Sequence, residues 1–206
     1  MKIWTAAVAA VSVMGAAGAQ ADAPAVSDKD LAPAVKAFLA DHGDLCVGWY
    51  TWPRDLTAAE QQTGINEAVQ LPVLERLGVV RSVEIASAAP TRRYSLTTKG
   101  KQYYLHKTRI TLNVHSQSEA HDGDFCAAHL TLDKVVKWTP PETANGHLET
   151  VAQYTYHIKA AEWMTDPEAR KVFPVVDRII RGEGRMLMSA TVAFKDGQWV
   201  PVLPGQ

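Results

Sequence analysis

The N-terminal stretch constrains this chain most, because it decides which residues belong to the fold and where they fold. Met1-Lys2 supplies one positive charge, and the uncharged residues 3–19 that follow are rich in Ala and Val. Ala19-Gln20-Ala21 then has the small-x-small pattern that precedes signal-peptidase cleavage. The pattern predicts a cleaved signal peptide over residues 1–21 and a mature protein that is exported to the periplasm.

The alternative interpretation of this stretch is an uncleaved membrane anchor. Residues 3–19 are at the short end for a bilayer span, and their Ala and Gly content makes them only weakly hydrophobic. No other apolar run in the sequence approaches membrane-spanning length. We therefore expect a soluble mature protein without a membrane span after cleavage.

Export changes the interpretation of Cys46 and Cys126, the two cysteines of the sequence. In an oxidising compartment two cysteines most simply form one disulfide. Such a bond would close a loop of about 80 residues, which the chain-entropy model credits with roughly 4 kcal/mol of stabilisation. We expect this disulfide.

Composition and charge describe an ordinary globular protein with an uneven charge distribution. With 47% hydrophobic and 21% charged residues the chain is neither disordered nor fibrous, and a net charge of −1 argues against a dedicated nucleic-acid binder. The charges are segregated, however: residues 22–80 carry a net −5, residues 81–111 a net +6 and residues 112–206 a net −3. The basic middle segment therefore lies between two acidic flanks.

The first part of the mature chain is predicted to be mainly helical. Leu31, Val35, Phe38 and Leu39 form one apolar stripe that predicts a helix ending near Gly43. The capping-box spacing of Thr57-Ala58-Ala59-Glu60 opens a second helix, and a third is expected over residues 66–77. A two-stranded hairpin over residues 79–96 and a short helix capped by Thr97 follow.

Two segments of this part resemble winged-helix domains. They are Leu71-Pro72-Val73-Leu74-Glu75-Arg76-Leu77-Gly78-Val79-Val80 and Tyr94-Ser95-Leu96-Thr97-Thr98-Lys99-Gly100. In winged-helix domains a helix ends in a Leu-Gly-aliphatic step, a two-stranded wing follows, and a Leu-Thr-x-x-Gly segment opens the closing helix. The resemblance covers residues 56–106 only and implies a winged-helix-like part within a unit over residues 22–106.

The remaining chain, residues 107–206, alternates with the period of two that half-buried strands have. One predicted inward face, shared with Cys126, comprises Ala128, Leu130, Leu132, Val136 and Trp138. Thr165-Asp166-Pro167-Glu168 opens a helix that Pro174 should kink or split, and Asp196-Gly197 is a hairpin turn. We predict an antiparallel sheet with this one main helix packed on it, and an α+β fold overall.

The basic segment supplies the first candidate binding surface. Arg92, Arg93, Lys99 and Lys101 could hold an anionic partner, because wing residues can meet phosphate. Outside the cytoplasm such a partner would be a lipid head group, an acidic polymer or an acidic protein surface, whereas nucleic acid is unlikely. The alternative is a solvated wing that pairs with the protein's own acidic groups.

The second candidate is aromatic. Trp49 and Trp52 belong to the densest aromatic run, which could stack on a ligand or simply fill the core beside Cys46. A group of histidines and carboxylates lacks the spacing of a metal motif, so no metal site and no cofactor are expected. That group is His115, His121, Asp122, Asp124 and His129.

The sequence therefore favours a non-enzymatic binding or interaction module of the bacterial cell envelope. The first alternative is a small hydrolase in which Cys46 is the nucleophile and His129 or His157 the base. A second alternative is a winged-helix DNA binder, which requires that the chain is not exported. Oligomeric state and the identity of the partner stay open.

Overall fold

The structure is a computed structural model, which describes residues 26–86, 89–112, 117–144 and 146–202 of the 206-residue chain. The predicted signal peptide, residues 1–21, lies outside the described residues. Helices are combined with antiparallel sheets, which confirms the predicted α+β class. None of the described helices is long and apolar enough to cross a bilayer.

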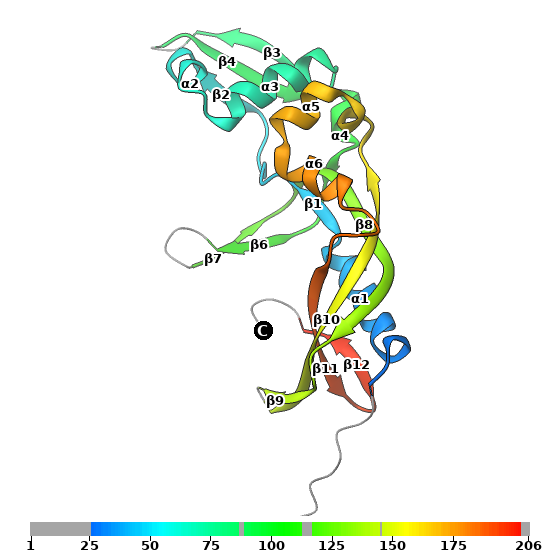
Figure 1. Cartoon of the computed structure of the whole chain (residues 1–206). Coiled ribbons are helices and arrows are strands. Elements are labelled where there is room, and N and C mark those ends of the chain that lie inside the picture. The colour runs from blue at the N-terminus through cyan, green and yellow to red at the C-terminus, as the bar shows by residue number, and fades with distance from the viewer. Residues whose placement is uncertain (1–25, 87–88, 113–116, 145, 203–206) are drawn as a thin grey trace, which may run out of the picture.

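A long, curved antiparallel sheet runs through the lower two thirds of the molecule (Figure 1). Its strand order is β1-β8-β10-β11-β12, with the short β5 added to β8 and β9 added to β10. The strands are β1 (Asp44–Cys46), β5 (Tyr104–Leu105), β8 (Asp124–Trp138), β9 (Glu142–Ala144), β10 (His147–Ala160), β11 (Met188–Lys195) and β12 (Gln198–Pro201). Asp196 and Gly197 both have positive φ in the β11–β12 turn, as the sequence predicts for this hairpin.

One predicted inward position on β8 is wrong. Val135 is buried, with 8% of its surface exposed, whereas Val136, which the alternation places inside, is 45% exposed. The register between β8 and β10 shifts near this point, where Gln153 faces Lys137 and the next residue, Tyr154, faces Val135. A second shift follows between Thr155, which faces Lys134, and Tyr156, which faces Leu132. Each bulge inserts one residue in β8, so the in-out alternation is reversed only between them, and Leu132 and Trp138 both pack against the hydrophobic core of this sheet as predicted.

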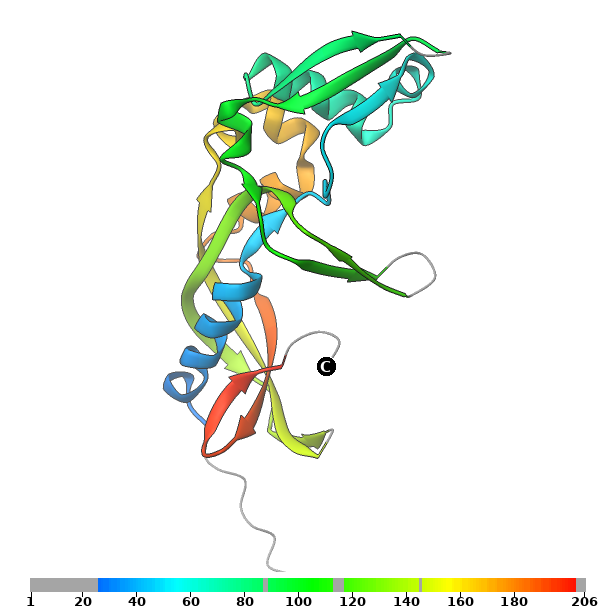
Figure 2. The ribbon, with the colours of Figure 1, turned by 180° about the vertical axis from the view of Figure 1, so that it is seen from behind.

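Helix α1 (Asp28–His42) covers one face of this sheet and lies in front of it in Figure 2. Ser27 caps the helix in a capping box with Asp30. Leu31, Val35 and Leu39 bury the predicted stripe against the sheet. The helix on the sheet is therefore α1, and not the helix of residues 167–181 to which the sequence analysis gave this role. We call α1 and the sheet it covers the lower body.

The upper body is built around a three-stranded sheet of order β2-β4-β3. It contains β2 (Arg54–Thr57), α2 (Ala58–Gln62), α3 (Asn66–Arg76), β3 (Val80–Ile85), β4 (Thr91–Leu96) and α4 (Thr98–Lys101). Thr57 and Thr97 cap α2 and α4 through their side chains, as predicted. Residues 87–88 of the predicted turn lie outside the described residues.

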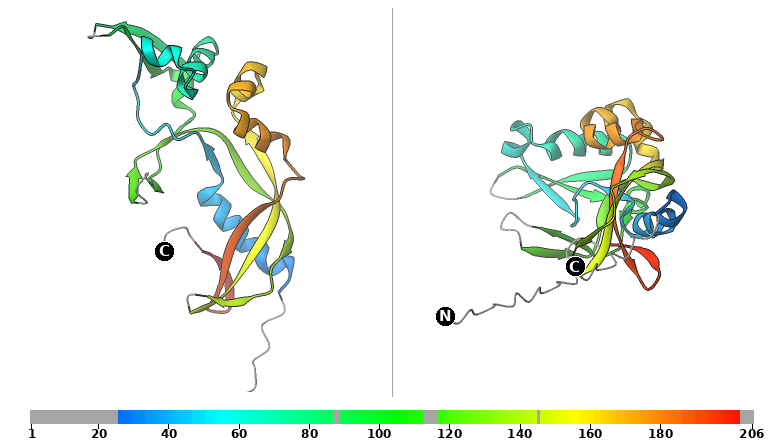
Figure 3. Two further views of the ribbon diagram at one scale, coloured as in Figure 1. Left: turned by 60° about the vertical axis from the view of Figure 1, so that its left-hand side comes forward. Right: turned by 60° about the horizontal axis from the view of Figure 1, so that its bottom comes forward.

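A second chain segment completes the upper body. After β10 the chain forms the 3₁₀ helix η1 (Glu162–Thr165), α5 (Pro167–Val172) and α6 (Pro174–Arg181), and Pro174 separates the two α-helices. Figure 3 shows this segment beside α3. Arg76 Nη2 lies 2.7 Å from Asp166 Oδ1, and Gln70 donates a hydrogen bond to the carbonyl of Val172. The helix predicted for the sheet packs here because the chain turns away from the sheet at Ala161.

Residues from both sides of residue 106, where we expected one part of the mature chain to end and the next to begin, therefore pack in the same body. The chain leaves the lower body after β1 and returns at β8, and it leaves again after β10 and returns at β11. We call these two segments, residues 47–123 and residues 161–187, the first and second excursions. The two excursions share one aromatic core, in which Trp163, Phe125 and Phe173 are buried. Helix α1 and β1, by contrast, belong to the lower body.

A third element projects sideways from the middle of the molecule (Figures 1 and 2). It is a hairpin of β6 (Arg109–Leu112) and β7 (Ser118–His121), and the side chain of Ile110 on it is 74% exposed. Residues 113–116 of the alternating stretch that begins at residue 107 lie outside the described residues. His121 stacks on Tyr50 with 3.7 Å between ring centroids and fixes the hairpin to the upper body.

Candidate functional site

Cys46 and Cys126 form the predicted disulfide. They are register partners on β1 and β8, so the bond joins two neighbouring strands at the place where the first excursion leaves and returns. Both cysteine sulfur atoms of the sequence are engaged in this bond. The hydrolase alternative requires a thiolate at Cys46, and the oxidised protein has none.

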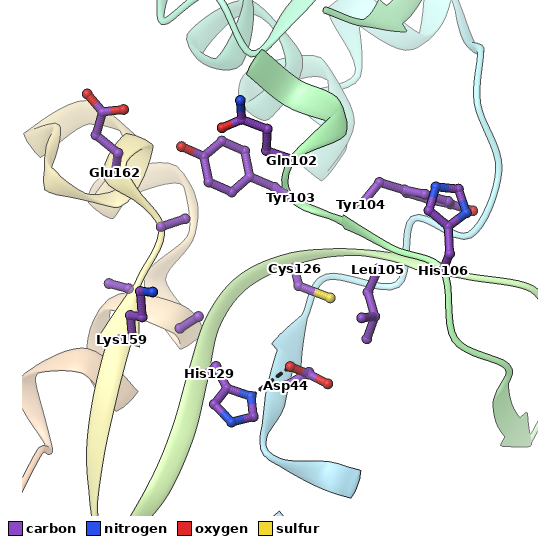
Figure 4. A pocket seen from close by; sticks show the side chains of 13 residues that line it. Asp44, Gln102, Tyr103, Tyr104, Leu105, His106, Cys126, His129, Lys159 and Glu162 are labelled. Carbon is purple, nitrogen blue, oxygen red and sulfur yellow. Dashed lines mark hydrogen bonds and ion pairs between the residues drawn. The ribbon is translucent and has the colours of Figure 1, made fainter. Parts of the chain in front are cut away.

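The disulfide borders the pocket that we take as the candidate site, a cavity of about 630 Å³ between the two bodies (Figure 4). We call it the disulfide pocket. Its polar lining comprises Asp44, Gln102, Tyr103, Tyr104, His106, His129, Lys159 and Glu162. Leu105, Cys126, Ala128, Ala160 and Ala161 complete the lining. The volume is in the range of small-molecule binding sites.

Both carboxylates of the pocket contact another side chain of the protein. His129 Nδ1 lies 2.8 Å from Asp44 Oδ1, a contact that joins β8 to β1. Glu162 Oε2 lies 3.4 Å from Lys99 Nζ, which connects η1 to α4. Both carboxylates are therefore engaged within the protein before any ligand binds, Glu162 by the charged ammonium of Lys99.

Lys159 is the one lysine of the lining, and its side chain is exposed. It is the register partner of His129, so both side chains lie on the same face of the β8–β10 pair. Within the described residues Lys159 forms no salt bridge. Its ammonium group is thus the positive charge that the fold leaves available at the pocket.

The tyrosines give the pocket a rigid wall. The hydroxyl of Tyr104 donates a hydrogen bond to the carbonyl of Tyr50. Burial, together with the negative charges of Asp124 and Asp122, raises the pKa of Tyr104, so its phenol remains a protonated donor. The ring of Tyr103 packs edge-on against Phe125 of the upper core. Both rings are therefore held by the protein before a ligand arrives.

The basic residues predicted to bind an anion do not converge. Arg92 and Arg93 are consecutive on β4 and point to opposite faces of the three-stranded sheet. Arg93 binds Asp55 with two contacts of 2.7 Å, and Arg92 lies 3.8 Å from Glu75. The hydrogen bonds from Arg93 lower the pKa of the Asp55 carboxyl, which keeps this pair charged.

The two lysines lie elsewhere. Lys99 pairs with Glu162 at the pocket, whereas Lys101 is exposed at the end of α4. Three of the four predicted cations therefore contact the protein's own carboxylates. This geometry favours the alternative interpretation, in which the basic segment is balanced by its acidic flanks.

Trp49 lies in the core, which favours the interpretation that the aromatic run fills the core beside Cys46. Only 4% of its surface is exposed, its ring stacks on Phe125 with centroids 5.9 Å apart, and Arg54 lies over its other side at 5.2 Å. Trp52 is half-buried and packs edge-on against Trp49. The aromatic run fills the core next to the disulfide, because the two excursions pack against each other and bury aromatic side chains between them.

The histidine and carboxylate group is dispersed. His121 stacks on Tyr50, His129 pairs with Asp44, and Asp124 accepts the backbone N–H groups of Trp49 and Phe125. His115 lies outside the described residues. In the part of the chain that the structure describes, no three His, Cys, Asp or Glu side chains are placed to hold a metal ion.

Sequence reasoning missed most of the disulfide pocket. Gln102 and Tyr103 are adjacent, Lys159 comes from a segment far from them in the chain, and none of the three belongs to a recognisable motif. The alternation of β10 places Lys159 on a solvent-exposed face, but it does not show which other segments of the chain lie next to that face. The only usable signal was Cys126, because a disulfide brings its neighbours on both strands together.

The chain matches no protein-family model, no curated protein and no solved structure.

Proposed function

We propose that the mature protein is an exported, non-enzymatic binding module of the bacterial cell envelope, and that it binds its partner at the disulfide pocket. The observation that carries this proposal is the pocket itself. It combines rigid aromatic walls, an apolar floor and an available cation in a cavity of about 630 Å³. Such a mixture of apolar surface with a few placed polar groups is typical of binding sites.

Two independent features support export. The sequence of residues 1–21 has the pattern of a cleaved signal peptide, and the disulfide is a bond that persists in oxidising compartments. Expression of the full chain in a Gram-negative host tests this part of the proposal. We expect the periplasmic fraction to contain a protein that begins at Asp22 by intact-mass measurement; a cytoplasmic protein that retains Met1 would refute export.

The disulfide supports binding over hydrolysis at Cys46. With both sulfurs engaged, His129 has no thiol to activate and is instead paired with Asp44. Thiol titration of the unreduced mature protein should detect no free thiol. Two free thiols per chain would restore the hydrolase alternative.

The three-stranded sheet has the order β2-β4-β3, and α2 and α3 lie between β2 and β3 in the chain. This arrangement supports a winged-helix-like shape for residues 54–101. DNA binding by that part is disfavoured, because the second helix of such a motif enters the major groove. Here α3 is that helix, and α5 packs against it through Arg76–Asp166 and Gln70–Val172. The element that would read DNA thus contacts its own chain.

A neutral fluorescent probe, N-phenyl-1-naphthylamine, tests occupancy of the pocket. Its emission should rise on binding to the mature protein and stay low for Ala160→Phe, which fills the pocket from β10. Ala40→Phe, at an exposed position of α1, is the matched control and should bind the probe normally. Equal emission from both variants, with unchanged melting temperatures, would refute the pocket as the binding site.

A further inference from the structure

The charged side chains that line the disulfide pocket differ in whether another side chain of the protein already engages them. Asp44 is paired with His129, and Glu162 with Lys99. Lys159 has no such partner among the described residues. Both carboxylates of the lining are therefore already engaged by other side chains, whereas the Lys159 ammonium is available, so the pocket offers an anionic group a cation to bind.

Apolar side chains also line the pocket near this cation. Ala160 ends β10 directly after Lys159 and Ala161 follows it, Ala128 on β8 is the register partner of Ala160, and Leu105 of β5 also belongs to the lining. These side chains offer no hydrogen bonds. A fully hydrated inorganic ion would gain little from them, whereas an apolar ligand body would bury surface there.

We propose that the ligand of the disulfide pocket is a small organic anion, with its charged group on Lys159 and an apolar or aromatic body against the alanine and Leu105 surface. This inference rests on the proposed binding function and specifies its ligand class. A carboxylate and a phosphate ester share the required chemistry, since each presents anionic oxygens to an ammonium donor.

A matched pair of probes isolates the charge. 1-Anilinonaphthalene-8-sulfonate has the same ring system as N-phenyl-1-naphthylamine and adds one sulfonate group. The mature protein should bind the sulfonate probe about tenfold more tightly, the effect of one charge-assisted contact at a partly exposed site. Raising the salt concentration to 0.5 M should reduce this preference, because salt screens exposed charges.

Variants assign the preference to one side chain. Lys159→Met keeps the length and apolar stem of the side chain, and it should lower affinity for the sulfonate probe about tenfold without changing affinity for the neutral probe. Lys134→Met, at an exposed lysine of β8 outside the pocket, is the control and should change neither affinity. Melting temperatures of the two variants verify that both are folded.

Competition distinguishes the possible sources of the anion. Benzoate or phenyl phosphate should displace the sulfonate probe from the wild-type protein, and benzyl alcohol should not. Displacement by benzoate alone would assign the site to carboxylates, and displacement by phenyl phosphate alone to phosphate esters; both support the inference.

Two results would overturn it, and they differ from failure of the proposed function. Equal affinity for the two probes, or an unchanged affinity of Lys159→Met for the sulfonate probe, would exclude the anionic ligand while leaving a binding pocket. If neither probe bound the wild-type protein, the proposed binding function itself would fail.

Discussion

Replacement of both disulfide cysteines by serine should destabilise the protein mainly through its unfolded state. Cys46 and Cys126 are 80 residues apart in sequence, and the loop-closure relation for that length gives about 4.5 kcal/mol at 25 °C. In the folded protein the same two positions are paired by neighbouring strands, so the serines lose little. Since domains are stable by about 5–15 kcal/mol, the expected loss is a large part of the total.

Urea unfolding followed by tryptophan fluorescence measures this loss. With a denaturant slope of about 2 kcal/mol/M, the midpoint of Cys46→Ser/Cys126→Ser should fall by roughly 2 M. The slope should also increase, because an unfolded chain without the cross-link exposes more surface. Wild-type protein unfolded in dithiothreitol is the control and should give the same midpoint as the variant.

The reasoning fails if the variant loses less than about 1 kcal/mol of unfolding free energy, since the loop would then be ordered without its cross-link. A reduced wild-type protein that is much more stable than the serine variant would also refute it. In that case the serines, and not the open loop, would cause the loss.

Three further predictions concern stability. Tyr156→Phe removes the hydrogen bond of 2.6 Å to the carbonyl of Ile179 and should cost about 1–2 kcal/mol in urea unfolding; no loss would mean that this link is not needed. Gly43→Ala places a Cβ 2.5 Å from the carbonyl oxygen of Leu130, and the overpacking should cost about 1–3 kcal/mol, so an unchanged melting temperature would contradict the close approach. The pKa of Asp166 is lowered, chiefly by its hydrogen bond from an arginine, so its charged form stabilises the fold at neutral pH and this contribution disappears as the pH falls below about 4. The stability difference between wild type and Asp166→Asn should therefore shrink between pH 5 and 2, and a constant difference would refute the assignment.

Local structure could be predicted because its signals are local. Thr57 and Thr97 cap helices through residues three positions away, and Pro174 breaks a helix by removing its own N–H group. The Asp196-Gly197 turn likewise depends on two residues with positive φ. Each of these elements is specified by residues that lie only a few positions apart in the sequence.

The arrangement of the elements could not be predicted in the same way. The apolar stripe of α1 shows that the helix is buried on one side, but the stripe would fit either body. Val136 was misplaced because a bulge arises from the pairing of two strands and has no signature in one of them. The disulfide pocket is harder still, since its lining belongs to segments near residues 44, 103, 128 and 160.

The position of the disulfide also has a consequence for how this architecture can arise and be altered. Because β1 and β8 are adjacent, the chain between them begins and ends at one point, as an inserted module does. The second excursion has the same property, since it starts on β10 and ends on the neighbouring β11. The lower body thus keeps its sheet and helix on either side of these two segments, and both segments contribute residues to the upper core. A shortened chain that joins β1 to β8 and β10 to β11 by tight turns keeps every strand neighbour of the lower sheet except β5.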